Sequence, residues 1–201
     1  MTIVQLHGLP RSGTNFLKKV LETNFYVRVD AKLKHFPARY GVGQLVFVSK
    51  HPVDWVLSLF EFELTCNLTD SHTDWDKYLE AGIVTQFGLK NAWFANPVQI
   101  WNAYLHHYVN HRDMIHAQWE QLCNPDTRDG YLEGLGRQLH LPRKRDTFEF
   151  HVDRLDPQGV STGEVFKPRE RSTRYTQRQI DWVWSQVNKD LAARLRYHTR
   201  G

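Results

Sequence analysis

The sequence has few cysteines and no long apolar run, and each absence excludes a class of protein. Only two cysteines, Cys66 and Cys123, occur among 201 residues, and they are far apart. Two isolated cysteines argue against a disulfide framework or a structural zinc site and fit a reducing compartment, so we expect a cytoplasmic protein. No window approaches the roughly 18 consecutive apolar residues of a membrane span, and the first residues do not resemble a signal peptide. We therefore expect no membrane partner.

The net charge of the chain is also small. Lys and Arg number 26 and Asp and Glu 22, which gives a formal net charge of +4. This excess suits an anionic ligand but is too small to indicate nucleic acid, so we expect no nucleic-acid partner. The apolar and charged fractions are those of a globular protein, and the length suits a single domain covering 1–201. The oligomeric state cannot be inferred from these features.

Segments typical of strands alternate with segments typical of helices. Strands are expected at 2–6, 25–30, 44–49 and 113–119, and helices at 15–23, 53–64, 75–82, 96–110, 128–141 and 176–197. Pro52 suits a first helical turn, and Asn96 and Thr176 suit N-caps. The alternation predicts an α/β fold with a mainly parallel central sheet. The long irregular stretch 142–175 is expected to be a binding lid or a mobile segment.

A glycine loop follows the first strand in "VQLHGLPRSGTNFL". Gly8 and Gly13 have the spacing of a phosphate-binding loop, in which backbone N–H groups and the positive helix end face an anion. The lysine and metal-binding hydroxyl of an ATPase loop are missing, since Thr14 and Asn15 stand in their places. The cation is Arg11, inside the loop. The pattern favours an anion held without Mg²⁺; the alternative is an ordinary strand-to-helix turn.

A second block, "LVFVSKHPVDWVLSLFEF", places a cation at the end of the third strand. Ser58 lies about two helical turns beyond Lys50, so a cation and a hydroxyl could converge on one phosphate. The alternative is a strand-to-helix turn that carries a surface lysine.

Both blocks resemble motifs of the sulfotransferases that use 3′-phosphoadenosine 5′-phosphosulfate (PAPS). The resemblance extends in order along nearly the whole chain and implies a P-loop-type three-layer α/β/α fold. It implies that the 5′-phosphate and sulfate are held by Arg11, Ser12, Gly13, Thr14 and Asn15. Lys50, where the family usually carries arginine, and Ser58 would hold the 3′-phosphate. A basic loop would cover the nucleotide, with Arg169 and Arg171 among its residues; an acidic-substrate patch and a solvated surface are the alternatives.

The segment "KLKHFP" resembles the part of the family that carries a general base. The histidine at that position is His35, and the lysine usually found two residues before it is Leu33, flanked by Lys32 and Lys34. A histidine has the near-neutral pKa that accepting a hydroxyl proton requires. Some branches of the family use a carboxylate, for which Asp30, Glu61 and Glu63 are the reserve candidates.

The resemblance therefore implies transfer of a sulfuryl group from PAPS to a hydroxyl or amine, yielding 3′,5′-ADP without a metal. Arg11 and His35 would be the catalytic residues, and the acceptor would be a small molecule or a carbohydrate. The aromatic residues between 70 and 95 are the proposed acceptor platform: Trp75, Tyr78, Phe87, Trp93 and Phe94. An ATP-dependent small-molecule kinase and a non-catalytic nucleotide or anionic-glycan binder are the alternatives.

Overall fold

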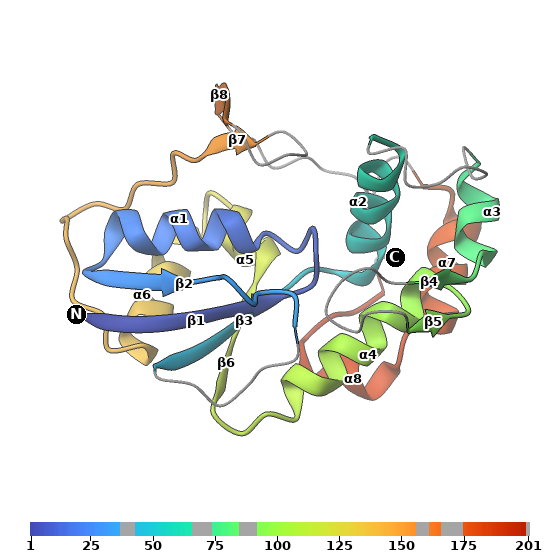
Figure 1. Cartoon of the computed structure of the whole chain (residues 1–201), viewed down its shortest axis with the longest axis horizontal. Coiled ribbons are helices and arrows are strands. Elements are labelled where there is room, and N and C mark those ends of the chain that lie inside the picture. Colours follow the sequence, from blue (N-terminus) through green and yellow to red (C-terminus); the bar gives the residue numbers. More distant parts are fainter. Residues whose placement is uncertain (37–42, 66–73, 85–91, 156–160, 166–174, 200–201) are drawn as a thin grey trace.

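Four parallel strands form the central sheet, in the order β2-β1-β3-β6 (Figure 1). The computed structural model describes residues 1–36, 43–65, 74–84, 92–155, 161–165 and 175–199. The strands are β1 (Thr2–Gly8), β2 (Val27–Asp30), β3 (Gln44–Ser49) and β6 (Met114–Gln118). The predicted α/β fold with a mainly parallel sheet is confirmed, and the predicted strand at 44–49 has the observed bounds.

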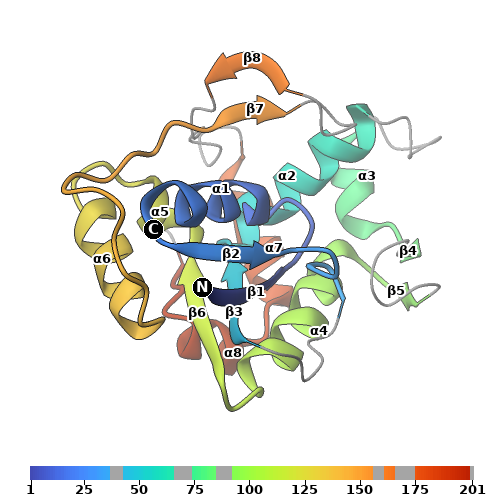
Figure 2. The ribbon, with the colours of Figure 1, turned by 60° about the vertical axis from the view of Figure 1, so that its left-hand side comes forward.

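Side chains of the strands alternate between two hydrophobic clusters. On β3, Val46 and Val48 pack with helices α1 (Thr14–Asn24) and α6 (Arg128–Gln138). Phe47 packs instead with α2 (Pro52–Thr65), α4 (Pro97–Val109), α7 (Gln177–Gln186) and α8 (Lys189–Arg194). In Figures 1 and 2, α1 lies above the sheet, while α4 and α8 lie below it. Burying each large apolar side chain contributes about 1.5–3 kcal/mol to folding, so both clusters hold the strands in place.

The helix boundaries follow the expected capping residues. Pro52 begins α2. The side chain of Asn96 accepts a hydrogen bond from the N–H of Gln99 at the start of α4. Thr176 forms a capping box with Gln179 at the start of α7. All three predictions are confirmed: Asn96 and Thr176 each accept from an N–H group that the first helical turn leaves unbonded, and Pro52 has no N–H group to leave unbonded.

The C-terminal region differs from the expected single helix over 176–197. It forms α7 and α8, separated by Val187 in an extended conformation and by Asn188. The Asn188 side chain accepts a hydrogen bond from the N–H of Leu191, so a new N-cap interrupts the helical pattern.

Smaller elements complete the described chain. They are α3 (Trp75–Glu80), α5 (Trp119–Cys123), the antiparallel pair β4 (Ile83–Val84) and β5 (Trp93–Phe94), and the antiparallel pair β7 (Asp153–Leu155) and β8 (Ser161–Val165). The last pair lies within the stretch expected to be irregular, and it stands above α1 in Figures 1 and 2. None of the helices in the described part of the chain is long and apolar enough to cross a membrane.

Candidate functional site

The candidate site lies where the loops after β1 and β3 leave the sheet. These strands are neighbours, and Gly8 at the end of β1 pairs with Val48. The loop after β1 enters α1, which packs in one hydrophobic cluster, whereas the loop after β3 enters α2, which packs in the other. Ligands of open α/β sheets bind at the carboxyl ends of the strands where successive connections diverge in this way.

The glycine loop is tightly folded. Arg11 has a φ of 66° and Gly13 a φ of 96°, both in the left-handed region. The N–H and hydroxyl of Ser12 both donate to the carbonyl of Leu9, at 3.2 and 2.6 Å. A left-handed arginine costs roughly 1–3 kcal/mol, and such residues cluster at functional sites. The loop therefore holds Arg11 in a conformation that the surrounding structure must enforce.

The start of α1 is suited to an anion. Its N-cap is Gly13, and α1, which is described in full, has no side-chain cap and no acidic residue in its first turn. Arg11 and Asn15 are exposed beside it, and the Arg11 guanidinium lies 4.9 Å from the centre of the Phe62 ring. Helix N-termini without a capping carboxylate or hydroxyl attract phosphate and sulfate oxygens.

Two tryptophans brace the loop. The Nε1–H of Trp55 in α2 donates to the carbonyl of Pro10 at 2.7 Å. Trp119 packs directly on Gly13, where a Cβ atom would fall 2.1 Å from the ring. The Lys50 ammonium lies 5.3 Å from the centre of the Trp119 ring. Trp119 therefore joins the loop after β1 to the loop after β3.

The turn after β3 is held by buried polar groups. The N–H of His51 donates to Glu120 Oε1 at 2.7 Å, and the Nε1–H of Trp101 donates to the Lys50 carbonyl at 3.0 Å. Burial raises the pKa of Glu120, although the hydrogen bond from His51 opposes the shift. The hydroxyl of Tyr197 donates to Glu120 Oε2 at 3.2 Å. Glu120 is thus the acceptor that fixes the orientation of the turn carrying Lys50.

Residues 31–36 lie against the end of β1. The N–H of Gly8 donates to the Lys34 carbonyl at 2.8 Å, and His35 Nδ1 donates to the Gly8 carbonyl at 2.8 Å. The Lys34 ammonium donates to Asn15 Oδ1, and the Tyr108 hydroxyl donates to the Phe36 carbonyl at 3.2 Å. A cation and an imidazole from outside the glycine loop are therefore placed beside it.

The chemistry of His35 follows from this placement. A carbonyl oxygen only accepts, so Nδ1 carries the proton and the neutral ring presents its lone pair at Nε2. Burial is the main cause that lowers the pKa of His35 to about 4, and the nearby Lys34 charge adds to the shift. His35 is therefore neutral at pH 7, as a proton acceptor must be, but its pKa lies below the near-neutral value expected from the sequence.

The predicted donor-binding residues differ in how well the structure positions them for a ligand. It brings Arg11, Ser12, Gly13, Thr14 and Asn15 together in one turn, and the ring of Trp119 lies close to both Gly13 and Lys50. The Ser12 hydroxyl is fully buried and donates within the loop, and Ser58 is only 2% exposed within α2. Neither hydroxyl faces solvent in this structure. Arg169 and Arg171 lie outside the described residues.

The proposed acceptor platform is partly corrected. Tyr78 is 1% exposed and stacks on Trp75, and both rings pack against Phe60 with centroids 4.8 and 4.9 Å apart. Tyr78 is therefore a core residue and offers no surface for a substrate, whereas Trp75 is partly buried and packs against the core. Trp93 is 66% exposed, and Phe87 lies outside the described residues.

Three features of the site were missed by sequence reasoning. The cation beside Asn15 is Lys34, and the sequence pattern did not distinguish it from Lys32. Trp119 and Glu120, which brace the two loops, were interpreted as a structural block with no stated link to the site. The lysines that flank Leu33 were the signal nearest to the first feature, but no local pattern predicts contacts across the sheet.

No group of metal-ligating side chains occurs within the described ranges. No protein-family model matches the chain, and no curated protein matches it either. Any family assignment therefore depends on the motifs and on their geometry.

Proposed function

We propose that this chain is a PAPS-dependent sulfotransferase, with a P-loop-type three-layer α/β/α fold. The observation that carries the proposal is the contact of residues 31–36 with the glycine loop. Lys34 reaches Asn15 and His35 reaches Gly8, so a cation and a base stand beside a loop built for an anion. An ATPase loop would instead carry its lysine and its metal-binding hydroxyl in positions 14 and 15.

The residues present fit the donor. The amides from Arg11 to Asn15 and the exposed side chains of Arg11 and Asn15 would hold the 5′-phosphate and the sulfate, since the first turn of α1 lacks a side-chain cap. Lys50 would attract the 3′-phosphate from the neighbouring strand, and Ser58 would need to become accessible to join it. Arg169 and Arg171 would cover the bound nucleotide. Lysine forms a point contact rather than the bidentate contact of arginine, so we expect a weaker 3′-phosphate contact.

The donor supplies a sulfuryl group, whose transfer breaks the S–O bond to the phosphate, forms an S–O bond to the acceptor and leaves 3′,5′-ADP. Arg11 and Lys34 would stabilise the negative charge that develops on the bridging oxygen. His35 Nε2 would take the proton from the acceptor hydroxyl. The Gly8 carbonyl holds the opposite nitrogen, Nδ1, which fixes the tautomer needed for that step.

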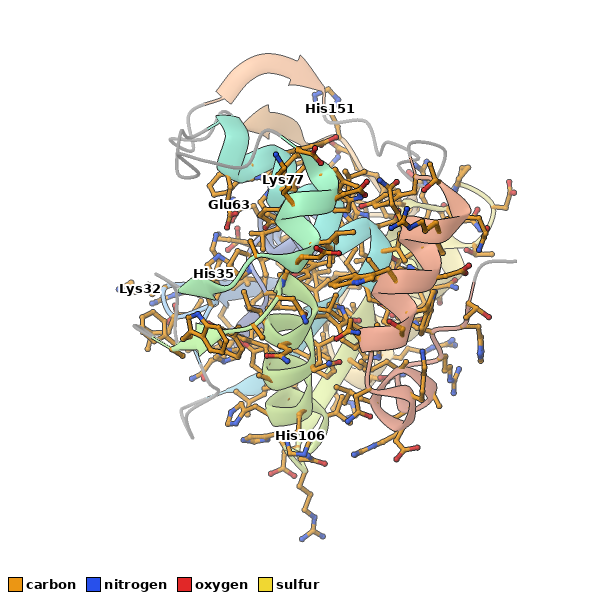
Figure 3. All side chains as sticks on the ribbon, turned by 90° about the vertical axis from the view of Figure 1, so that its right-hand side faces the viewer. Lys32, His35, Glu63, Lys77, His106 and His151 are labelled. Atoms are coloured by element: carbon orange, nitrogen blue, oxygen red, sulfur yellow. The ribbon has the colours of Figure 1, made fainter. Side chains whose placement is uncertain are left out.

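A carboxylate is the alternative base. Burial raises the pKa of Glu63 in α2, which favours its use as a proton acceptor near neutral pH. In the view of Figure 3, Glu63 lies above His35 on the same side of the molecule. His35 is the preferred base because its contact with the glycine loop is direct.

The test is a transfer assay with ³⁵S-labelled PAPS and a panel of phenols, saccharides, amines and tyrosine peptides. We expect transfer by the wild type and a loss of about 10²–10⁴-fold in His35→Asn, the range for a general base. His106→Asn is the matched control, because His106 is exposed on α4 and lies far below His35 in Figure 3. Both variants should bind 3′,5′-ADP like the wild type.

Two outcomes would contradict the proposal. If the wild type bound 3′,5′-ADP yet transferred sulfate to none of the panel, a non-catalytic binder would be favoured. Phosphate transfer from ATP–Mg²⁺ in place of sulfate transfer would favour a kinase.

A further inference from the structure

A basic cavity lies on the β2 side of the glycine loop. Its volume is about 380 Å³, which is within the range of small-molecule sites. Six polar residues line it: Asn15, Lys18, Arg28, Asp30, Lys32 and Lys34. Four of these are cationic and one is acidic, so the cavity has a net positive charge.

The wall of the cavity is held by specific contacts. Glu22 Oε1 accepts from the N–H of Val29 at 3.1 Å, and Glu22 Oε2 pairs with Lys18 at 2.5 Å, which ties α1 to β2. The N–H of Lys32 donates to Asp30 Oδ1 at 3.0 Å. The cavity is therefore built before any ligand arrives, which lowers the ordering cost of binding.

The position of the cavity separates it from the proposed donor site. The sheet order places β2 and β3 on opposite sides of β1, and Lys50 follows β3. Asn15 and Lys34 belong to the cavity and also lie beside the glycine loop. His35 follows Lys34 directly and contacts Gly8. A molecule in this cavity would thus meet the glycine loop at Asn15 and Lys34, on the side of β1 opposite Lys50.

The cations in the cavity favour an anionic occupant. Arg28 and Lys32 are exposed at its rim, and Lys34 is half-buried. Burial and the neighbouring Lys18 charge lower the pKa of Lys34, since both disfavour its ammonium form. A negative group between these side chains would relieve the repulsion and gain charge-assisted hydrogen bonds.

We propose that this cavity binds the acceptor through an anionic group, so that the substrate is a sugar-sized hydroxyl compound bearing phosphate, sulfate or carboxylate. The inference rests on the proposed sulfotransferase function and adds the chemical class of the acceptor. The same chemistry could come from a free sugar phosphate or from one unit of an anionic glycan, and the two sources are separated below.

The experiment measures binding to three proteins by isothermal titration calorimetry. They are the wild type, Arg28→Gln/Lys32→Gln, and Lys19→Gln/Arg137→Gln, which removes the same charge from exposed positions outside the cavity. Each protein is first titrated with 3′,5′-ADP. The complex is then titrated with glucose 6-phosphate, a heparin-derived tetrasaccharide and neutral maltotetraose. The ionic strength is about 0.15 M, where distant surface charges are screened.

The inference predicts equal affinity of the three proteins for 3′,5′-ADP. It predicts that at least one anionic saccharide binds the wild type and the control variant, and that the Arg28/Lys32 variant binds it about 10-fold more weakly. Maltotetraose should not bind. Binding of glucose 6-phosphate indicates a free sugar phosphate, and binding of the tetrasaccharide alone indicates a polymeric glycan.

Several results would overturn the inference while leaving the proposed function intact. One is an equal loss of affinity for the anionic saccharides in both double variants. The others are binding of maltotetraose as tight as that of the anionic saccharides, and no binding of either anionic saccharide. A loss of 3′,5′-ADP affinity in the Arg28/Lys32 variant would assign the cavity to the donor. If the wild type failed to bind 3′,5′-ADP, the proposed function itself would fail, and this inference would fall with it.

Discussion

The ammonium of Lys34 donates a hydrogen bond to the side-chain oxygen of Asn15, although the two residues are 19 positions apart in the sequence. Asn15 lies in the first turn of α1, directly after the glycine loop. The loop itself carries no lysine at this point. A separate segment therefore supplies the cation that an ATPase loop would provide from its own sequence.

Replacing Lys34 with methionine should weaken binding of the donor, PAPS, more than binding of its product, 3′,5′-ADP. Lys34 contacts Asn15 at the end of the loop proposed to hold the sulfate, and a charge-assisted hydrogen bond contributes about 1.5–3 kcal/mol. We expect the affinity for PAPS to fall about 10- to 100-fold and that for 3′,5′-ADP to change less than about 3-fold. Calorimetry measures both. Lys19→Met, at an exposed position of α1, is the control, and equal losses of affinity for both ligands would argue against a sulfate contact.

Alanine at position 13 should destabilise the protein. A Cβ there meets the Trp119 ring at 2.1 Å, and the φ of 96° is unfavourable for alanine. We expect the free energy of unfolding to fall by about 2–4 kcal/mol in urea denaturation followed by fluorescence. Adding Trp119→Leu should recover part of the loss.

Gly130→Ala is the control, because no atom lies within 4 Å of a Cβ built at this position in α6. It should raise stability by about 0.5–1 kcal/mol. Comparable losses at positions 13 and 130 would show that Trp119 does not pack on the loop.

Stability should decrease as the pH falls from about 6.5 to 4. Burial lowers the pKa of His116 to about 4, compared with 6.5 for an ordinary histidine. Between these values the unfolded chain binds a proton that the folded chain does not, so the free energy of unfolding falls with pH. His116→Gln can keep the hydrogen bond to Ser49 and should reduce this slope. Urea denaturation at pH 7, 5.5 and 4.5 measures this dependence of the free energy of unfolding on pH. The same dependence in His116→Gln and in the wild type would show that His116 is not its cause.

Binding of 3′,5′-ADP should raise the pKa of His35. Without ligand it is about 4, and phosphate groups near Gly8 would stabilise the imidazolium. NMR titration of the ring protons, assigned with His35→Asn, follows the shift. The ring of His106, which is exposed on α4, serves as the reference signal. A pKa of His35 that stays the same on binding would place the nucleotide elsewhere.

Much of the fold was predictable from local chemistry. The buried run over 44–49 and the caps at Asn96 and Thr176 each act within a few residues, and all three were predicted correctly. The break at Asn188 was missed because the apolar periodicity continues across it. Helical periodicity reports which face is buried and is insensitive to a short interruption.

The site was predictable only in part, for a similar reason. The glycine spacing identified the loop, because the backbone conformations of the loop depend on residues that are adjacent in the sequence. The roles of Lys34 and Trp119 depend on contacts between segments that the sheet brings together. Tyr78 was misinterpreted because an aromatic side chain suits a core as well as a surface.

The measurement that tests the central claim most directly is calorimetric titration of the wild type with 3′,5′-ADP, AMP and ATP, each with and without Mg²⁺. The account predicts that 3′,5′-ADP binds most tightly, that loss of its 3′-phosphate weakens binding, and that Mg²⁺ has no effect. Arg11→Ala should weaken 3′,5′-ADP binding as well. Preference for ATP–Mg²⁺, or absence of binding by all three nucleotides, would contradict the account.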